Sequence, residues 1–146
     1  MFKYNEVMYI QKTLNTFQKM TQMGDLTLYE PAGDAPQSEN SKRTGRYQST
    51  SLADCISNVS TPYGEKAILK TMVTTACEKN CFYCPFRAGR GKTRRITLKP
   101  DEIAQEFDKL QRAKRVEGLF LSSGIIKGGM PTQDKILDTV EIIRRK

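Results

Sequence analysis

Three cysteines within eight residues are the part of this sequence best suited to chemistry. They are Cys77, Cys81 and Cys84, in the stretch Cys-Glu-Lys-Asn-Cys-Phe-Tyr-Cys. Three thiolates from one short loop can hold a metal centre while leaving one of its coordination positions open. An open position lets a small molecule bind the metal, which distinguishes a site of chemistry from a purely structural one. The spacing therefore predicts a metal centre with a chemical role.

The ligands available in the chain narrow the choice of metal. A closed structural zinc site needs four Cys or His ligands, and this chain has no histidine and only one further cysteine, Cys55. A [4Fe-4S] cluster can take several thiolates from one tight loop, and with three of them one iron keeps an exchangeable position. We expect Cys55 to be a buried, inert thiol, with a fourth-ligand or redox role as the alternative. A four-cysteine zinc module that binds nucleic acid and an electron-transfer iron–sulfur module stay open, and both would need Cys55.

The composition limits the size and location of the protein. The chain has 146 residues, of which 38% are hydrophobic, enough for one modest core. No stretch approaches the ~18 apolar residues that a membrane-spanning helix needs, and Lys3 and Glu6 interrupt the N-terminus where a signal peptide would be apolar. We therefore expect a cytoplasmic protein with no membrane partner, where reducing conditions favour metal binding over disulfides.

Positive charge is concentrated just after the cysteines. Residues 51–99 hold 9 basic and 3 acidic side chains, so they carry +6 of the net charge of +8. Cations beside an anionic thiolate cluster are physically reasonable, nucleic acid is a candidate partner, and a solvated basic loop is the alternative. Most of this charge comes from Arg87, Arg90, Lys92, Arg94, Arg95 and Lys99.

The N-terminal third predicts a helix and a linker ahead of the core. Apolar residues recur there at intervals of three and four, so residues 1–30 are expected to form a helical extension that packs on the protein. Residues 31–53 are rich in Pro, Gly, Ser, Asn and charge, and they predict a flexible polar linker. The apolar positions of the expected helix are Val7, Ile10, Leu14, Phe17 and Met20.

Residues 54–146 begin with a turn and a strand, followed by the cysteine loop and a helix. The mostly apolar run 67–73 predicts a buried strand, after a turn at Thr61–Gly64. The cysteine loop follows over residues 74–95. Pro100 should open a helix, because proline suits the first helical position and acidic residues follow it. Its inner face is expected to contain Ile103, Phe107, Leu110 and Ala113.

A second strand and a last helix complete the pattern. Residues 116–121 predict a strand with a continuously apolar half, which is typical of strands covered on both faces. Thr132 is expected to cap the last helix. The inner face of that helix is expected to contain Ile136, Val140 and Ile143.

This order of elements predicts an α/β fold with a parallel strand–helix–strand unit. In such folds, function collects in the loops that leave the carboxyl ends of the strands. The cysteine loop and Ser122-Ser123-Gly124 both occupy such positions. We therefore expect these two segments to lie side by side.

The cysteine motif resembles the signature of the radical S-adenosylmethionine (SAM) enzymes. The resemblance rests on Cys77-x3-Cys81-x2-Cys84 after a strand, with the aromatic Tyr83 before the last cysteine. Three sequence segments together more narrowly resemble radical SAM proteins assigned to DNA modification or repair, which carry a helix-hairpin-helix region further along. These segments are Asp54-Cys-Ile-Ser-Asn, Cys-Phe-Tyr-Cys-Pro-Phe-Arg and Phe-Leu-Ser-Ser-Gly-Ile.

The resemblance implies roles for particular residues. The three cysteines would bind three irons of a [4Fe-4S] cluster, and the fourth iron would bind SAM. Reduction would cleave SAM to methionine and a 5′-deoxyadenosyl radical. Tyr83 matches the aromatic position beside the adenine, and Ser122, Ser123 and Gly124 occupy the place of the glycine-rich motif that meets the SAM amino group. This sequence lacks the acidic residue usual there, so a plain strand-ending turn is the alternative.

The resemblance also implies that the chain is an N-terminal fragment of a partial (β/α) barrel. The resemblance covers residues 54–146, which correspond to about two βα units. We expect a truncated radical SAM core, which is either the product of a truncated or split reading frame or one piece that a second polypeptide completes. The other expected partner is a reducing electron donor.

Overall fold

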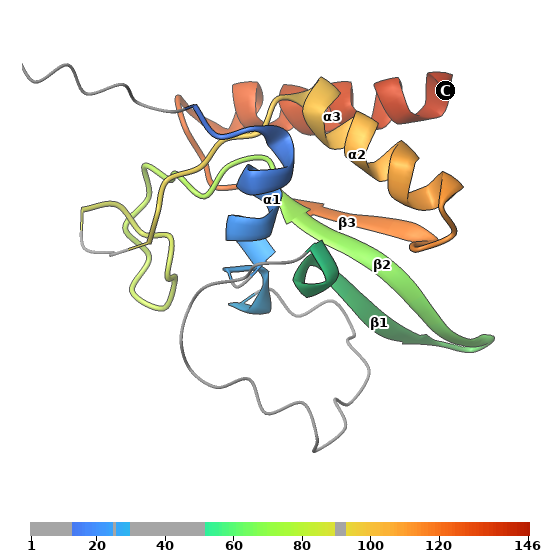
Figure 1. The fold of residues 1–146 in the computed structure, drawn as a ribbon. Coiled ribbons are helices and arrows are strands. Elements are labelled where there is room, and N and C mark those ends of the chain that lie inside the picture. Colours follow the sequence, from blue (N-terminus) through green and yellow to red (C-terminus); the bar gives the residue numbers. More distant parts are fainter. Residues whose placement is uncertain (1–12, 25, 30–51, 90–92) are drawn as a thin grey trace, which may run out of the picture.

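The computed structural model describes residues 13–24, 26–29, 52–89 and 93–146. In this part of the chain three α-helices accompany one three-stranded sheet, so the fold is mixed α/β, as predicted (Figure 1). The elements are α1 (Thr16–Gly24), the 3-10 helices η1 (Leu26–Tyr29) and η2 (Leu52–Cys55), β1 (Ile56–Thr61), β2 (Gly64–Met72), α2 (Pro100–Arg112), β3 (Gly118–Ser122) and α3 (Gly129–Arg145).

The sheet has the order β1-β2-β3, with β2 in the middle. β2 and β3 are parallel, with Leu69 opposite Leu119, and the chain between them passes through the cysteine loop and α2. This confirms the predicted strand–helix–strand order. Because β2 and β3 run the same way, their carboxyl ends lie at the same edge of the sheet.

The first strand, β1, was not predicted. It pairs antiparallel with β2 across a two-residue turn, Pro62-Tyr63, so the predicted turn joins two strands of a hairpin. Gly64 follows with a φ of 106°, a backbone conformation that glycine adopts without strain. Polar pairs on either side of Val59, Ser57-Asn58 and Ser60-Thr61, leave β1 no apolar run that would signal a buried strand.

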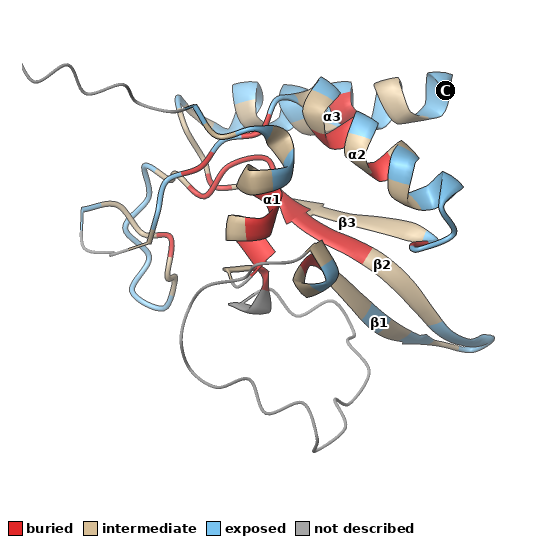
Figure 2. Cartoon of the chain, viewed as in Figure 1, coloured by how far each residue is buried: buried red, intermediate tan, exposed pale blue. Residues whose placement is uncertain are grey.

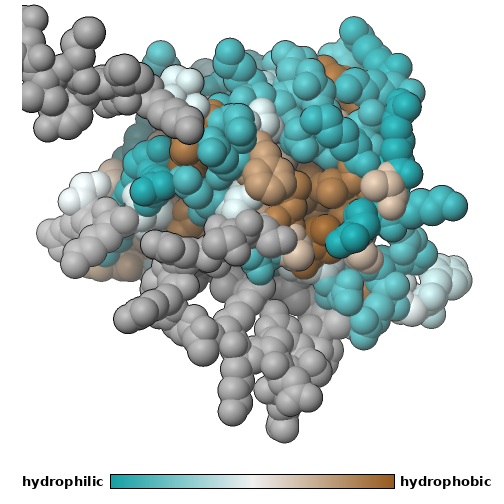
Figure 3. Space-filling model, viewed as in Figure 1, coloured by the Kyte–Doolittle hydropathy of each residue, from teal (hydrophilic) through white to brown (hydrophobic). Residues whose placement is uncertain are grey.

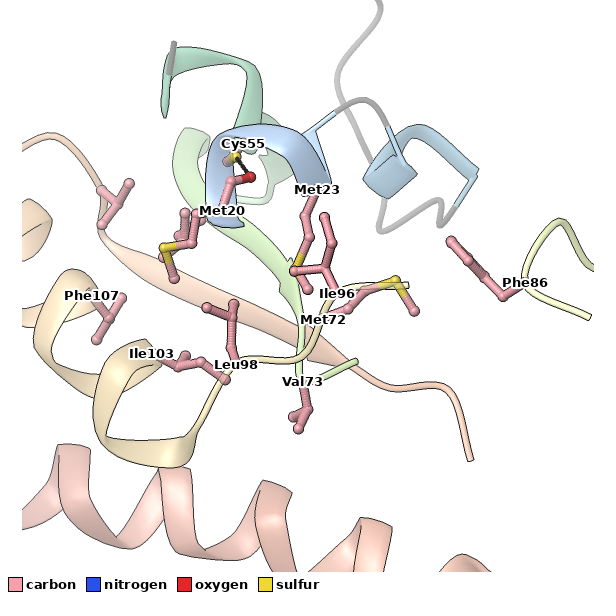
Figure 4. Close-up of a cluster of buried hydrophobic side chains, with 12 residues drawn as sticks. Met20, Met23, Cys55, Met72, Val73, Phe86, Ile96, Leu98, Ile103 and Phe107 are labelled. Carbon is pink, nitrogen blue, oxygen red and sulfur yellow. Dashed lines mark hydrogen bonds between the residues drawn. The ribbon is translucent and has the colours of Figure 1, made fainter. Parts of the chain in front are cut away.

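The core lies where β2 meets α1 and α2. The last four residues of β2 are all buried, and Met20 and Met23 of α1 are fully buried near them (Figure 2). Side chains from α1, α2 and the segment before α2 point toward one another, and apolar residues also gather between α2 and the strands on the face drawn in Figure 3 (Figures 3 and 4). The core cluster comprises Met20, Met23, Cys55, Leu69, Met72, Val73, Phe86, Ile96, Leu98, Ile103, Phe107 and Val116.

Several expectations about the helices need correction. In α1 burial begins at Met20, and Phe17, one turn earlier, is 47% exposed, so the predicted inward position is wrong. In α2 Ile103 and Phe107 are buried as predicted and Leu110 is half-buried, but Ala113 lies past the end of the helix and is exposed. Val7 and Ile10, and most of the expected linker, lie outside the described residues.

The last helix also begins earlier than the sequence suggested. α3 starts at Gly129, after Gly128 with a φ of 92°, so Thr132 lies in the first turn and is not the cap. Its hydroxyl donates to the Gly128 carbonyl at 3.0 Å. Ile136 and Ile143 are half-buried as predicted, but Val140 is exposed, because Thr139 occupies the buried position beside it.

The second strand is less covered than predicted. All five residues of β3 are only partly buried, whereas the end of β2 is buried on both faces. The reason is position: in the described part of the chain β3 has a strand neighbour on one side only.

None of the described helices is long and apolar enough to cross a membrane.

Glu102 joins α1 to the start of α2. Its carboxylate accepts hydrogen bonds from Lys19 Nζ at 2.9 and 3.0 Å and from the Thr16 hydroxyl at 3.1 Å. It also accepts the Lys99 backbone N–H at 2.8 Å, which satisfies a donor at the helix end. Partial burial acts to raise the pKa of Glu102, but the hydrogen bonds from Lys19, the Lys99 backbone and Thr16 outweigh it and hold the pKa below its ordinary value.

Replacing Glu102 tests this connection. We expect Glu102→Gln to lower the free energy of unfolding by about 1 kcal/mol at pH 7, measured by chemical denaturation. Because the folded pKa is depressed, the carboxylate stabilises the fold above its unfolded pKa of about 4.3, and this stabilisation is lost as the pH falls through the lower folded value. The difference between the two proteins should therefore shrink at acidic pH. Asp108→Asn, which removes an ion pair with the exposed Arg112, should cost less than about 0.5 kcal/mol.

Candidate metal centre

The cysteine loop leaves the carboxyl end of β2 and returns alongside it. Thr75 N–H donates to Ile96 O at 3.0 Å, and Leu98 N–H donates to Val73 O at 2.8 Å. The buried Thr75 hydroxyl donates to Arg94 O at 2.7 Å and accepts the Ile96 N–H at 2.9 Å. These bonds join the two ends of the loop to each other. The cysteines therefore lie on a loop whose two ends are held together by hydrogen bonds.

The loop after β3 lies against the start of the cysteine loop, as predicted. Gly124 N–H donates to Thr74 O at 2.8 Å, and Glu78 N–H donates to Ile125 O at 2.7 Å. A Cβ on Gly124 would be 2.2 Å from Ala76 O, so this approach requires glycine. The two loops that leave the parallel strands are thus joined backbone to backbone.

Cys77 lies at this junction, with its sulfur facing backbone donors. Cys77 Sγ accepts the N–H of Lys79 at 3.4 Å and the N–H of Ile125, from the other loop, at 3.5 Å. These two donors fix the position of the Cys77 sulfur between the two loops.

Cys81 and Cys84 lie on two consecutive turns at the outer end of the loop. Cys84 N–H donates to Cys81 O at 3.2 Å, and Arg87 N–H donates to Cys84 O at 3.3 Å. Cys81 is exposed, and Cys77 and Cys84 are half-buried. Within the described ranges, no three Cys, His, Asp or Glu side chains are grouped closely enough to hold a metal ion as they stand. The structure therefore places the three cysteines on one loop without gathering their thiols.

Three arginines of the basic segment make hydrogen bonds that hold the cysteine loop together or join it to α1. Arg95 Nη1 donates to Thr75 O at 2.7 Å and to Phe86 O at 2.8 Å, and its Nη2 donates to Arg87 O at 2.8 Å. Arg94 Nη1 donates to Gln22 Oε1 on α1. Residue spacing alone gave no signal for these contacts. Arg90 and Lys92 lie outside the described residues.

Arg87 is the third of these arginines, and it folds back over the loop's outer end. Its Nε donates to Asn80 Oδ1 at 2.8 Å, and its guanidinium carbon lies 4.8 Å from the centre of the Phe82 ring. The hydrogen-bond partners of these arginines are neutral carbonyl and amide oxygens, and within the described residues none of the three forms an ion pair. The positive charge therefore stays at the loop while the side chains serve its structure.

Glu78 links the cysteine loop to the start of α3. Its hydrogen bond with Lys79 is the main reason that the pKa of the Glu78 carboxyl is lowered, and the backbone N–H groups of Gly128 and Lys127 add to the effect. These N–H groups lie at the positive end of the α3 dipole, where a carboxylate is favourable.

The predicted SAM contacts differ in their surroundings. Tyr83 is 91% exposed, so its ring is available to a ligand. Ser123 Oγ donates to Gly124 O at 2.7 Å. Ser122 Oγ is buried, and no hydrogen-bond partner for it exists among the residues that the structure describes.

Cys55 lies in the apolar core, as predicted. It is 1% exposed, and its Sγ donates to the Met20 carbonyl at 3.1 Å (Figure 4). A thiol in this position is shielded from solvent and from oxidants. This surrounding makes Cys55 a poor candidate for a fourth ligand.

The donor set fits an iron–sulfur cluster, although its thiols are not preassembled. The loop offers three cysteines, two backbone donors at Cys77 Sγ and several arginines. Three buried side-chain polar atoms of the described residues lack a hydrogen-bond partner, and two of them, Arg87 Nη2 and Ser122 Oγ, belong to the cysteine loop and the end of β3.

Comparison of the chain with models of protein families, with curated proteins and with solved structures finds no match.

Replacing Gly124 tests the junction of the two loops. We expect Gly124→Ala to lower the free energy of unfolding by about 1–3 kcal/mol, because its Cβ would overlap the Ala76 carbonyl. Gly129→Ala is the matched control, since nothing lies within 4 Å of its Cβ position and alanine suits a helix. Thermal unfolding of both variants measures the difference, and equal melting temperatures would contradict the tight approach.

Proposed function

We propose that this chain carries the cluster-binding part of a radical SAM enzyme, in which Cys77, Cys81 and Cys84 bind a [4Fe-4S] cluster. The observation that carries the proposal is the position of the cysteine triplet. It lies on the loop that leaves the carboxyl end of β2, hydrogen bonded to the loop that leaves β3. In α/β folds this edge of the sheet is where cofactors and substrates bind.

The bound cluster would supply the electron that cleaves SAM to methionine and a 5′-deoxyadenosyl radical. The chain's own residues would bind and orient the cluster and SAM. Cys77 is held by the backbone of both loops, whereas Cys81 is exposed and can turn toward the other two thiols without disturbing the core. Tyr83 offers an exposed aromatic ring to the adenine, and the end of β3 offers the Ser122 hydroxyl, for which the described residues supply no hydrogen-bond partner.

The surroundings of Cys55 support this proposal over the two alternatives. Both a four-thiolate zinc module and an electron-transfer cluster would need Cys55 as the fourth ligand. Its thiol is buried in the core against α1 and donates to the Met20 carbonyl, so recruiting it would disrupt the packing of α1.

The wider architecture and the partners belong to the same proposal. β3 has an outer edge with no strand paired to it in the described part of the sheet, which leaves room for the further strand–helix units of a barrel. Reduction requires an electron donor, and free thiols accord with the cytoplasm. DNA modification or repair, and nucleic acid as partner, rest on the resemblance and on the positive charge.

Anaerobic reconstitution with ferrous iron and sulfide tests the proposal. We expect the full chain to bind about four irons and to give, after reduction, an electron paramagnetic resonance signal that changes when SAM is added. Substituting alanine for Cys77, Cys81 or Cys84 should abolish the signal.

The control for these variants is Cys55→Ala, which should still form the SAM-responsive cluster. Loss of metal binding in Cys55→Ala, together with a wild-type cluster that ignores SAM, would favour a fully ligated centre. Uptake of zinc alone under oxygen-free conditions would rule the proposal out.

A further inference from the structure

The guanidinium of Arg87 is fixed beside Cys81. Its Nε donates to Asn80 Oδ1 at 2.8 Å, and its Nη1 donates to Phe82 O at 3.4 Å. Asn80 and Phe82 are the neighbours of Cys81 on either side, and the guanidinium also lies over the Phe82 ring. Two hydrogen bonds and a cation–π contact therefore hold this cation against the turn that carries the second cysteine.

One nitrogen of this guanidinium is left over. Arg87 Nη2 is buried and has no hydrogen-bond partner among the described residues. A buried donor without an acceptor costs about 1–3 kcal/mol, so such atoms are rare unless a ligand supplies the acceptor.

The neighbouring arginines differ from Arg87 in their hydrogen-bond partners. Arg95 uses both terminal nitrogens on three carbonyls, and Arg94 reaches away to Gln22 on α1. Arg87 is thus the arginine of the described loop that combines anchoring at a cysteine with an unused buried donor. The planar fork of arginine makes this possible, because two nitrogens can hold the protein while the third serves a ligand.

We propose that Arg87 Nη2 donates a hydrogen bond to a sulfur at the corner of the cluster that Cys81 binds, and so raises the reduction potential of the cluster. This inference rests on the function proposed above. Adding an electron makes the cluster more negative, and a charged donor at its sulfur stabilises the more negative state. Arg87 accordingly acts on the cluster by direct contact with one of its sulfurs.

A redox titration of the reconstituted full chain tests this role. The proteins are wild type, Arg87→Gln, Arg87→Lys and, as the matched control that removes the same charge, Arg94→Gln. Dithionite is the reductant, and electron paramagnetic resonance measures the reduced fraction at each potential. Iron content and thermal melting are measured on the same samples.

We expect Arg87→Gln to bind the cluster with a potential more negative by about 59 mV, which corresponds to a tenfold lower ratio of reduced to oxidised cluster at a given potential. Arg87→Lys keeps the charge but loses the fork, so its shift should have the same direction and a smaller size. Arg94→Gln should stay close to wild type.

Other outcomes overturn the inference in distinguishable ways. An unchanged potential in Arg87→Gln with full iron content removes the role of Arg87 and leaves the proposed function intact. Equal shifts in Arg87→Gln and Arg94→Gln would assign the effect to general charge and not to a hydrogen bond. If Arg87→Gln does not fold, Arg87→Lys decides, and a wild-type potential there overturns the inference. A wild-type chain that takes up no cluster overturns both proposals.

Discussion

The close backbone contact between Gly124 and the segment Thr74–Ala76 is the constraint on which the candidate site depends. Parallel pairing of β2 and β3 brings both strand ends to one edge, but it does not make the following loops touch. Contact requires that position 124 carry no side chain, because a Cβ would overlap the Ala76 carbonyl. With glycine there, the N–H of Ile125 reaches the sulfur of Cys77.

Polar side chains stabilise the cysteine loop, which contributes few of its own residues to the core. In the described stretch 77–89 Phe86 is the buried apolar residue, and the backbone around it is held by the Thr93 hydroxyl and the Arg95 guanidinium. Carbonyl oxygens directed at a guanidinium are satisfied without a regular strand or helix. This arrangement leaves cysteines accessible on a loop whose base is well ordered by hydrogen bonds.

The sequence predicted those elements whose signals are local. The apolar run in β2, proline at the start of α2 and the apolar half of β3 each mark their element, and the adjacency of the two loops followed from parallel topology. β1 escaped prediction because its stability comes from pairing with β2, and its own residues are mostly polar. Strand pairing is a long-range property that a short window of sequence does not contain.

The helix faces and the arginine contacts escaped for other reasons. Val140 and Thr139 are adjacent, and which of them is buried depends on the rotation of α3, set by its start at Gly129. The cysteine spacing identified the candidate ligands directly, and whether they bind a cluster stays a prediction. The partners of Arg87 and Arg95 depend on the path of the loop, which charge and composition do not determine.

The hydrogen bond from Ile125 to Cys77 connects the segment just before α3 to the cysteine loop. Ile125 lies only a few residues before α3, and Glu78, next to Cys77, interacts with the backbone of Lys127 and Gly128 at the helix start. The position of the Cys77 sulfur therefore depends on where α3, a helix of seventeen residues, begins, as well as on the cysteine loop itself.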